Sequence, residues 1–183
     1  KKDNEDLKGP FKYKSDSDSK IIKKRVALLN EYKDFVDQQH YAEKFDSRSN
    51  LHSSILEEFM YYLFRDLVLG ISKSALIGKS HSFKDVFFRA PSYEAMVKAP
   101  HALVEKKDHD FAIGASVNAK MTCNGSGIIE DHTWDIPAVA IECKTYLDKT
   151  MLQDVSTAAE QLKQKNPDAM YIVVAEWLKL TES

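Results

Sequence analysis

Cysteine, long apolar runs and a surplus of positive charge are all scarce in this sequence. Only two of the 183 residues are cysteines, too few for the disulfide framework of a small secreted domain. No apolar stretch approaches the roughly 20 residues that cross a bilayer. These absences exclude a disulfide-rich secreted protein and a membrane-embedded one, and we expect a cytoplasmic protein.

The charge balance excludes a protein whose whole surface is positively charged. The formal net charge is −2, from 26 Lys and Arg against 28 Asp and Glu. Non-specific binding to nucleic acid depends on clustered basic residues. The charge is uneven, because residues 1–25 hold nine basic and five acidic residues, net +4, which leaves −6 elsewhere. The near-neutral total does not exclude a protein that contacts DNA through a local basic surface.

Length and composition predict one globular domain behind a short arm. Apolar residues make up 43% of the chain and charged residues 30%, as in ordinary soluble domains. Residues 1–20 are rich in Lys, Asp and Ser, and we expect a flexible charged arm there. Residues 21–183 then form a single domain. The first residue is not Met and no targeting segment follows it, so we expect a trimmed form or fragment of a longer chain.

Apolar residues at spacings of three and four predict three helices. The first covers residues 21–45, the second covers 51–69 until Gly70 ends it, and the third covers 149–165. Between the second helix and the first strand signal, residues 71–101 are interrupted by glycine and proline. We interpret that segment as a loop with short elements.

Strand signals occupy the second half of the chain. Residues 110–117 resemble a strand, a turn follows at 124–127, and the chain returns through 128–134 as a hairpin or meander. Residues 137–141 and 169–175 are short apolar runs typical of strands buried on both faces. The helix between these two runs predicts a right-handed crossover with parallel strands. The fold class is therefore α/β, with a mixed central sheet flanked by helices.

A Glu-x-Lys motif follows the first buried strand directly. Residues two apart on a strand point to the same face, so Glu142 and Lys144 project together. Asp110, from a neighbouring strand, offers a second carboxylate, and the backbone carbonyl of Cys143 offers a further oxygen. Metal-dependent phosphodiester hydrolysis needs hard oxygen ligands for Mg²⁺ and a group that orients or activates water. These residues predict such a site.

The Glu-x-Lys motif is informative only because of its position between a buried strand and a helix. The chain contains two further Glu-x-Lys sequences, Glu31-Tyr32-Lys33 and Glu105-Lys106-Lys107. The first lies in a helical pattern and the second beside a charged loop. Glu142 alone follows a buried strand and precedes a helix.

Here the sequence resembles the PD-(D/E)xK nuclease superfamily, and within it the type II restriction endonucleases. The family core runs helix, three strands, helix and strand, with an Asp on the second strand and the (Asp/Glu)-x-Lys on the third. The resemblance covers about residues 50–177 and implies a restriction-endonuclease-like α-β-β-β-α-β core. It implies Asp110 and Glu142 as ligands of Mg²⁺, for which Mn²⁺ can substitute, and Lys144 as the residue that positions or activates water. His109 stands where the family motif has proline, which leaves Asp108 as an alternative to Asp110.

The resemblance also implies a Glu from the first core helix, at Glu57 or Glu58. Periodicity does not choose between them, and we favour Glu58. Five polar residues of the following segment are candidate DNA contacts, although charged loop residues are usually only solvated. They are Lys79, Ser80, His81, Lys84 and Arg89.

The resulting hypothesis is a site-specific, Mg²⁺-dependent endonuclease acting on double-stranded DNA. Two copies of the domain, or one copy and a related partner, bind the duplex together, and each site cuts one strand. The alternatives are a repair or junction-resolving nuclease with the same core, and a DNA-binding module with an inert site.

Overall fold

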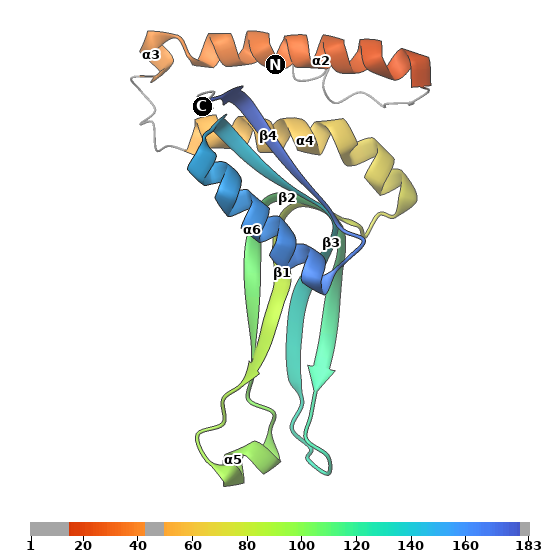
Figure 1. The fold of residues 1–183 in the computed structure, drawn as a ribbon. Coiled ribbons are helices and arrows are strands. Elements are labelled where there is room, and N and C mark those ends of the chain that lie inside the picture. The colour runs from red at the N-terminus through yellow and green to blue at the C-terminus, as the bar shows by residue number, and fades with distance from the viewer. Residues whose placement is uncertain (1–14, 43–49, 180–183) are drawn as a thin grey trace.

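A four-stranded mixed sheet, in the order β1-β2-β3-β4, lies between helices (Figure 1). The structure is a computed structural model that describes residues 15–42 and 50–179. Its elements are α2 (Ser15–Val36), α3 (Gln39–Ala42), α4 (Asn50–Ile71), β1 (Leu76–Phe88), α5 (Tyr93–Lys98), β2 (Ala102–Met121), β3 (Glu130–Leu147), α6 (Lys149–Lys165) and β4 (Met170–Leu178). None of the described helices has the length and apolar character needed to cross a bilayer.

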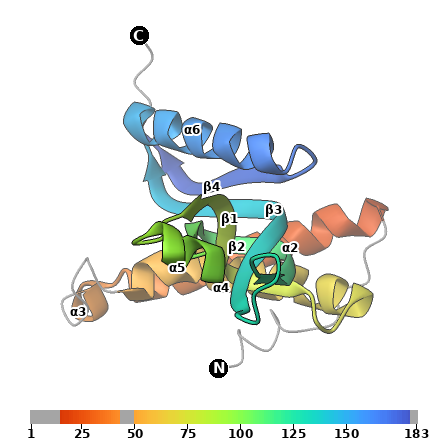
Figure 2. The same cartoon turned by 90° about the horizontal axis from the view of Figure 1, so that it is seen from below.

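The two faces of the sheet are covered by different helices (Figure 2). On one face, Phe59 and Met60 of α4 pack against Phe111 and Ile141 of the central strands, and α2 lies on the same side. On the other face, Leu162 of α6 packs against small side chains of the sheet region. Burial of apolar side chains from every layer supplies the main stabilising term for this arrangement.

Strand β2 joins two ladders. Its first part pairs antiparallel with β1, from Ala102 to Gly114, and its last part pairs antiparallel with β3, from Phe111 to Met121. Only a few residues in the middle of β2 have a neighbour on both sides. Figure 1 shows the consequence: β2 bends over at one end of the sheet, and the two ladders run side by side away from the helices.

Asp135 of β3 connects the two ladders through hydrogen bonds. Its carboxylate accepts a hydrogen bond from the backbone N–H of His81 on β1 at 2.8 Å and from the Ser116 hydroxyl on β2 at 2.6 Å. The rings of Phe83 and Trp134 lie 5.4 Å apart beside it. The far ends are also joined, because the Cys123 thiol and the Ser126 hydroxyl donate to carbonyls of α5.

The expected crossover is present. Strands β3 and β4 are parallel, with Ile141 beside Ile172 and Lys144 beside Ala175, and α6 connects them. The helix has the bounds that the sequence predicts, 149–165, and Asp148 caps it by accepting the Met151 N–H at 2.8 Å. The mixed α/β fold expected from the sequence is therefore confirmed.

Two expectations for individual strands are wrong. Residues 76–88 form a long strand instead of a loop, because the side chains that β1 buries include Ser80 and Ser82, and buried serines hide the apolar alternation. The return strand and the buried strand 137–141 are one continuous strand, β3. The sequence signal breaks at Pro137, where a register shift relative to β2 accommodates the proline.

The amino-terminal region also differs in detail. The helix expected over 21–45 begins earlier, at Ser15, and ends at Val36, with the short α3 after it. Residues 15–20 of the expected flexible arm are therefore helical. The remainder of the arm and residues 43–45 of the expected helix lie outside the described residues.

Candidate active site

The candidate site lies where β2 and β3 part. Their ladder ends at the pair Phe111 and Ile141, and the next residues on the two strands are Asp110 and Glu142. Beyond this point the β2–β3 ladder offers no backbone carbonyl to the Cys143 N–H, and the side-chain carboxylate of Asp110 accepts it at 2.8 Å. Backbone donors inside a protein need partners, so the diverging strands themselves favour a carboxylate at this position.

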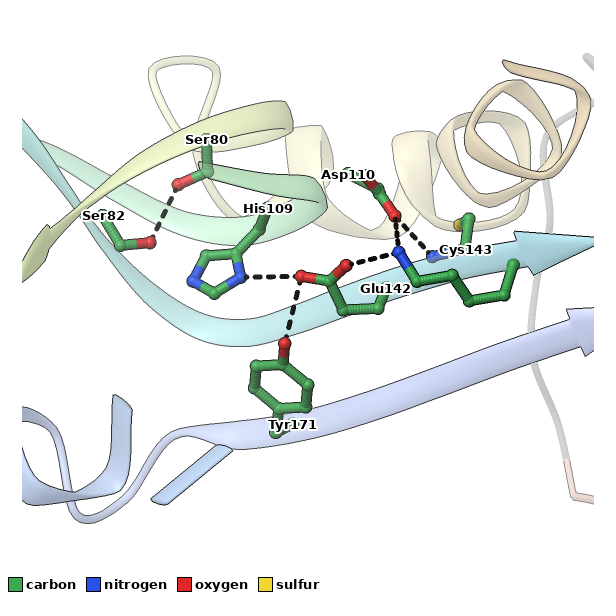
Figure 3. Close-up of polar contacts among 8 residues, drawn as sticks. Ser80, Ser82, His109, Asp110, Glu142, Cys143 and Tyr171 are labelled. Atoms are coloured by element: carbon green, nitrogen blue, oxygen red, sulfur yellow. Dashed lines mark hydrogen bonds and ion pairs between the residues drawn. The ribbon is translucent and has the colours of Figure 1, made fainter. Parts of the chain in front are cut away.

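Lys144 bridges the carboxylates of Asp110 and Glu142, which Figure 3 shows lying close together. Its Nζ lies 3.0 Å from Glu142 Oε2 and 3.4 Å from Asp110 Oδ2. The second oxygen of Glu142, Oε1, accepts the Tyr171 hydroxyl at 3.0 Å and lies 3.4 Å from His109 Nδ1. The structure thus brings together the three residues that the sequence places in one site.

These contacts set the ionisation of the site. Burial acts to raise the pKa of Glu142, but hydrogen bonds from His109, Lys144 and Tyr171 outweigh it and lower the pKa to about 2. Burial acts to lower the pKa of Lys144, but its hydrogen bond to Glu142 and the charges of Glu142 and Asp110 raise it. Glu142 is therefore ionised and Lys144 charged at neutral pH.

Cys143 takes part through its backbone. Burial, followed by the nearby carboxylates of Asp110 and Glu57, raises the pKa of its thiol to about 12. A neutral thiol is a poor nucleophile and a poor ligand. The side chain of Cys143 instead packs against the apolar cluster under α4.

The helix carboxylate beside the site belongs to Glu57. Burial raises its pKa, the charge of Asp110 raises it further, and Lys144 and Lys79 oppose the shift. Lys79 Nζ lies 3.7 Å from its carboxylate. Glu58 is exposed. The geometry therefore favours Glu57 and reverses our preference for Glu58, because adjacent helix residues project about 100° apart and only one can face the sheet.

A register shift explains why Asp110, and not Asp108, lies in the site. Gly78 pairs with Ala112 and Ser80 with His109, so two residues of β2 stand opposite Lys79 alone. Such a bulge re-aims the side chains beside it. Asp108 is 80% exposed and pairs with His81 at 2.7 Å, away from Glu142.

Sequence reasoning missed His109 and Tyr171 as members of the site. Strict alternation would direct His109 to the face opposite Asp110, and the register shift that overrides alternation is invisible in the sequence. For Tyr171 a signal existed, because it carries a hydroxyl within a buried apolar strand, and buried hydroxyls need partners.

The candidate DNA contacts do not form one surface. Ser80 is 1% exposed and its hydroxyl lies 3.3 Å from that of Ser82, so it is too buried to contact DNA. Lys79 is exposed near Glu57, and His81 is exposed beside Asp108. Lys84 forms an ion pair with Glu105, and Arg89 is exposed one residue beyond the end of β1.

The donor set fits Mg²⁺ or Mn²⁺ that a substrate helps to bind. Among the described residues, no three His, Cys, Asp or Glu side chains converge on one point. Two carboxylates do converge, with the Lys144 ammonium between them. Mg²⁺ is usually held by one or two carboxylates together with waters and substrate phosphates. Asp110, Glu142 and the Cys143 carbonyl are hard oxygen donors of this kind.

The fold is shared with solved structures. Three chains of solved structures match the fold, one of them from the "native BbvCI A2B2 tetramer at low resolution". The TM-score with that chain is 0.64 at 22% identity, and the match covers 89% of this chain and 56% of that chain. This chain thus spans little more than half the length of that neighbour.

The family follows from the sequence match. The profile described as the Bpu10I restriction endonuclease matches residues 48–183, well over half of the chain. The chain belongs to this family, which confirms the resemblance to type II restriction endonucleases. Among curated proteins, none matches it.

Proposed function

We propose that this chain carries the catalytic centre of a Mg²⁺-dependent type II endonuclease that hydrolyses double-stranded DNA at a specific sequence. The observation that carries the proposal is the cluster of Asp110, Glu142 and Lys144 at the divergence of β2 and β3. Membership of a restriction endonuclease family supports it. We place this activity in the cytoplasm of a prokaryotic cell.

Each residue has a distinct task in this proposal. Asp110 and Glu142, with the Cys143 carbonyl, hold the metal ion, and Glu57 adds a further carboxylate from α4. Bound Mg²⁺, or Mn²⁺ in its place, would offset the negative charge of the phosphate group whose phosphorus atom is attacked. The Lys144 ammonium stabilises the negative charge that grows on the attacking water as that water loses its proton to solvent. Lys79, exposed beside Glu57, and His81, exposed beside Asp108, are the proposed contacts to the DNA backbone.

One site cuts one strand, so we propose that a double-strand break needs two sites. The second site comes from another copy of this chain or from a related partner chain. The structural neighbour is described as an A2B2 tetramer, which supports such an assembly. DNA duplexes have two strands of opposite direction, and paired protein subunits match that near-symmetry.

The direct test is incubation with phage or plasmid DNA, followed by gel separation and sequencing of the ends. We expect cleavage or nicking at fixed positions with Mg²⁺ and none with EDTA. Glu142→Ala removes a proposed metal ligand and should reduce the rate by at least about 100-fold, since the ion and its polarising charge are lost. DNA binding should remain measurable for this variant.

The matched control is Glu31→Ala. It removes the glutamate of another Glu-x-Lys sequence, exposed on α2, and should leave the rate unchanged. The proposal would be contradicted if Glu142→Ala cut DNA at the parental rate. It would also be contradicted if the parent cut DNA as fast in EDTA as in Mg²⁺. Ends at random positions would instead indicate a non-specific nuclease.

A further inference from the structure

Two side chains outside the proposed metal ligands hold a single oxygen of Glu142. Tyr171 on β4 donates its hydroxyl to Oε1 at 3.0 Å, and His109 Nδ1 on β2 lies 3.4 Å from the same oxygen. The other oxygen, Oε2, is the one that Lys144 contacts at 3.0 Å. Figure 3 shows His109 and Tyr171 approaching Oε1 from two different strands, away from Asp110.

We propose that His109 and Tyr171 are positioning residues that fix the Glu142 carboxylate so that Oε2 faces the metal ion and the substrate phosphate. This inference rests on the proposed function. A carboxylate on a flexible side chain can present either oxygen by rotating about its last bond, which has low barriers. Two donors on Oε1 remove that freedom before the metal and DNA arrive.

The chemistry of each donor is defined by its surroundings. Burial and the charge of Glu142 raise the pKa of Tyr171, so its hydroxyl stays protonated and can donate. The contact of His109 with a carboxylate requires a proton on Nδ1. The side chain of His109 is 1% exposed and its edge-to-face contact with Tyr171 has a centroid distance of 5.7 Å. The two rings therefore form one packed unit around Oε1.

The remaining nitrogen of His109 shows that packing alone does not explain this residue. Its Nε2 is buried and has no hydrogen-bond partner among the described residues. The ring also lines a cavity of about 20 Å³ between the sheet and α6, large enough for one water molecule. An apolar side chain would fill the same space without a buried nitrogen to satisfy, so the contact from Nδ1 to Glu142 is what distinguishes histidine here.

Partners that orient a metal ligand typically change metal affinity or activity by about 10- to 100-fold when they are removed. The test therefore measures both. Binding of Mn²⁺ is measured directly by titration calorimetry on the full chain, without DNA and with a non-cleavable duplex. Single-turnover cleavage is measured over a range of Mg²⁺ concentrations.

Tyr171→Phe keeps the ring and removes only the hydroxyl. We expect it to weaken Mn²⁺ binding by about 10-fold and to raise by a similar factor the Mg²⁺ concentration that gives half-maximal cleavage. Metal-free DNA affinity should not change, and the protein should stay folded with a modestly lower melting temperature, because one hydrogen bond to a carboxylate is lost. Tyr93→Phe, on the exposed α5, is the matched control and should match the parent.

His109 is tested with two variants that separate hydrogen bonding from packing. Asn carries an amide nitrogen at the same position along the side chain as Nδ1, so His109→Asn should retain most of the Mn²⁺ affinity. His109→Leu fills the space without a donor and should lose about 10- to 100-fold. Equal affinities for the Asn and Leu variants would overturn the role of His109.

The outcome for this inference is distinguishable from that for the proposed function. If the parent binds Mn²⁺ and cuts, and Glu142→Ala does neither, the proposed function holds. Parental Mn²⁺ binding and Mg²⁺ dependence in Tyr171→Phe and His109→Leu would then overturn the positioning role alone. If Glu142→Ala binds Mn²⁺ like the parent, both proposals fail.

Discussion

At the scale of single residues, carboxylates in this protein take the place of missing strand partners. Asp110 does so for the Cys143 N–H, and Glu130 does so at the other end of the sheet. Glu130 accepts the backbone N–H groups of His101 and Ala102 at 2.8 and 2.9 Å. His101 has a φ of 51°, a conformation that costs energy for a residue other than glycine. We infer that Glu130 holds the chain in this conformation where β2 begins.

The hydrogen bonds that Glu130 accepts predict that the stability of the folded protein depends on pH. The backbone hydrogen bonds from Ala102 and His101 lower its pKa below the ordinary value of 4.5. A carboxylate whose pKa is lower in the folded state stabilises the fold above its unfolded pKa, and that contribution is lost as pH falls through the folded pKa. Glu130→Gln should therefore lower the melting temperature at pH 7, and the difference from the parent should shrink below pH 4.5.

Thermal unfolding of parent and variant between pH 3 and pH 8 checks this expectation. Glu94→Gln is a suitable control, because Glu94 is an exposed helix residue that pairs only with Lys98 among the described contacts. A difference between parent and Glu130→Gln that stays constant over this pH range would contradict the role of the Glu130 charge.

The residues of the site could be predicted from the sequence only where a local sequence pattern marked them. Asp110, Glu142 and Lys144 were recognisable because two of them follow a buried strand within one short motif. Glu57 and Glu58 were indistinguishable, because the apolar stripe of α4 places both at its margins. The Asp108 and Asp110 ambiguity is settled by a register shift, which arises from pairing with β1 and leaves no trace in β2 itself.

At the scale of elements, the bend and bulges of the sheet decide which strands can approach each other. The pairing of β2 with β3 shifts register between Ile113 and Gly114. A Cβ at Gly114 would lie 2.1 Å from the Ile136 carbonyl oxygen and 2.8 Å from Pro137 Cα. Real Cβ atoms do not approach backbone atoms so closely, so glycine is required for β2 and β3 to meet at this point.

Gly114→Ala should therefore destabilise the protein. The strands must separate locally to admit the methyl group, and overpacking of this kind typically costs about 1–3 kcal/mol, with larger values where backbone must move. The free energy of unfolding from urea titration measures the effect. Gly70→Ala in α4 meets no atom within 4 Å and should be neutral or slightly stabilising. A neutral Gly114→Ala would show that β2 and β3 do not meet as described.

Elements with strong local signals were predictable and the others were not. Helix α6 has an amphipathic face, a capping Asp148 and a stop at Asn166-Pro167, and its predicted bounds are confirmed. Strand β1 was missed because it buries Ser80 and Ser82, whose hydroxyls lie 3.3 Å from each other, instead of apolar side chains. Strand β3 was divided in two because Pro137 weakens the strand pattern.

At the scale of the whole molecule, one protomer offers one cluster of Asp110, Glu142 and Lys144. Under the proposed function, a chain acting alone should nick supercoiled plasmid, and paired sites should linearise it. Mixing the parent with excess Glu142→Ala should convert linear product to nicked circles, because mixed assemblies hold one working site. Time courses on agarose gels measure the two products.

The control for this mixing experiment is excess Glu31→Ala, which should leave the linear product unchanged. If the chain pairs with a different partner, the parent alone should yield only nicked circles. Linear product formed in one step by a species that sedimentation shows to be a monomer would contradict the paired-site arrangement.

The position of the site at the divergence of β2 and β3 has an evolutionary consequence. From Asp110, β2 extends eight residues toward α5 and eleven toward the turn before β3, or roughly 25–35 Å along the strand. The carboxylates are oriented by backbone and side chains of the strands themselves, and within residues 15–42 and 50–179 no loop takes part in the contacts that hold them. Insertions and substitutions at the distant ends can therefore accumulate without altering the geometry of the proposed cleavage centre. The same scaffold can diversify in what it contacts while its chemistry is preserved.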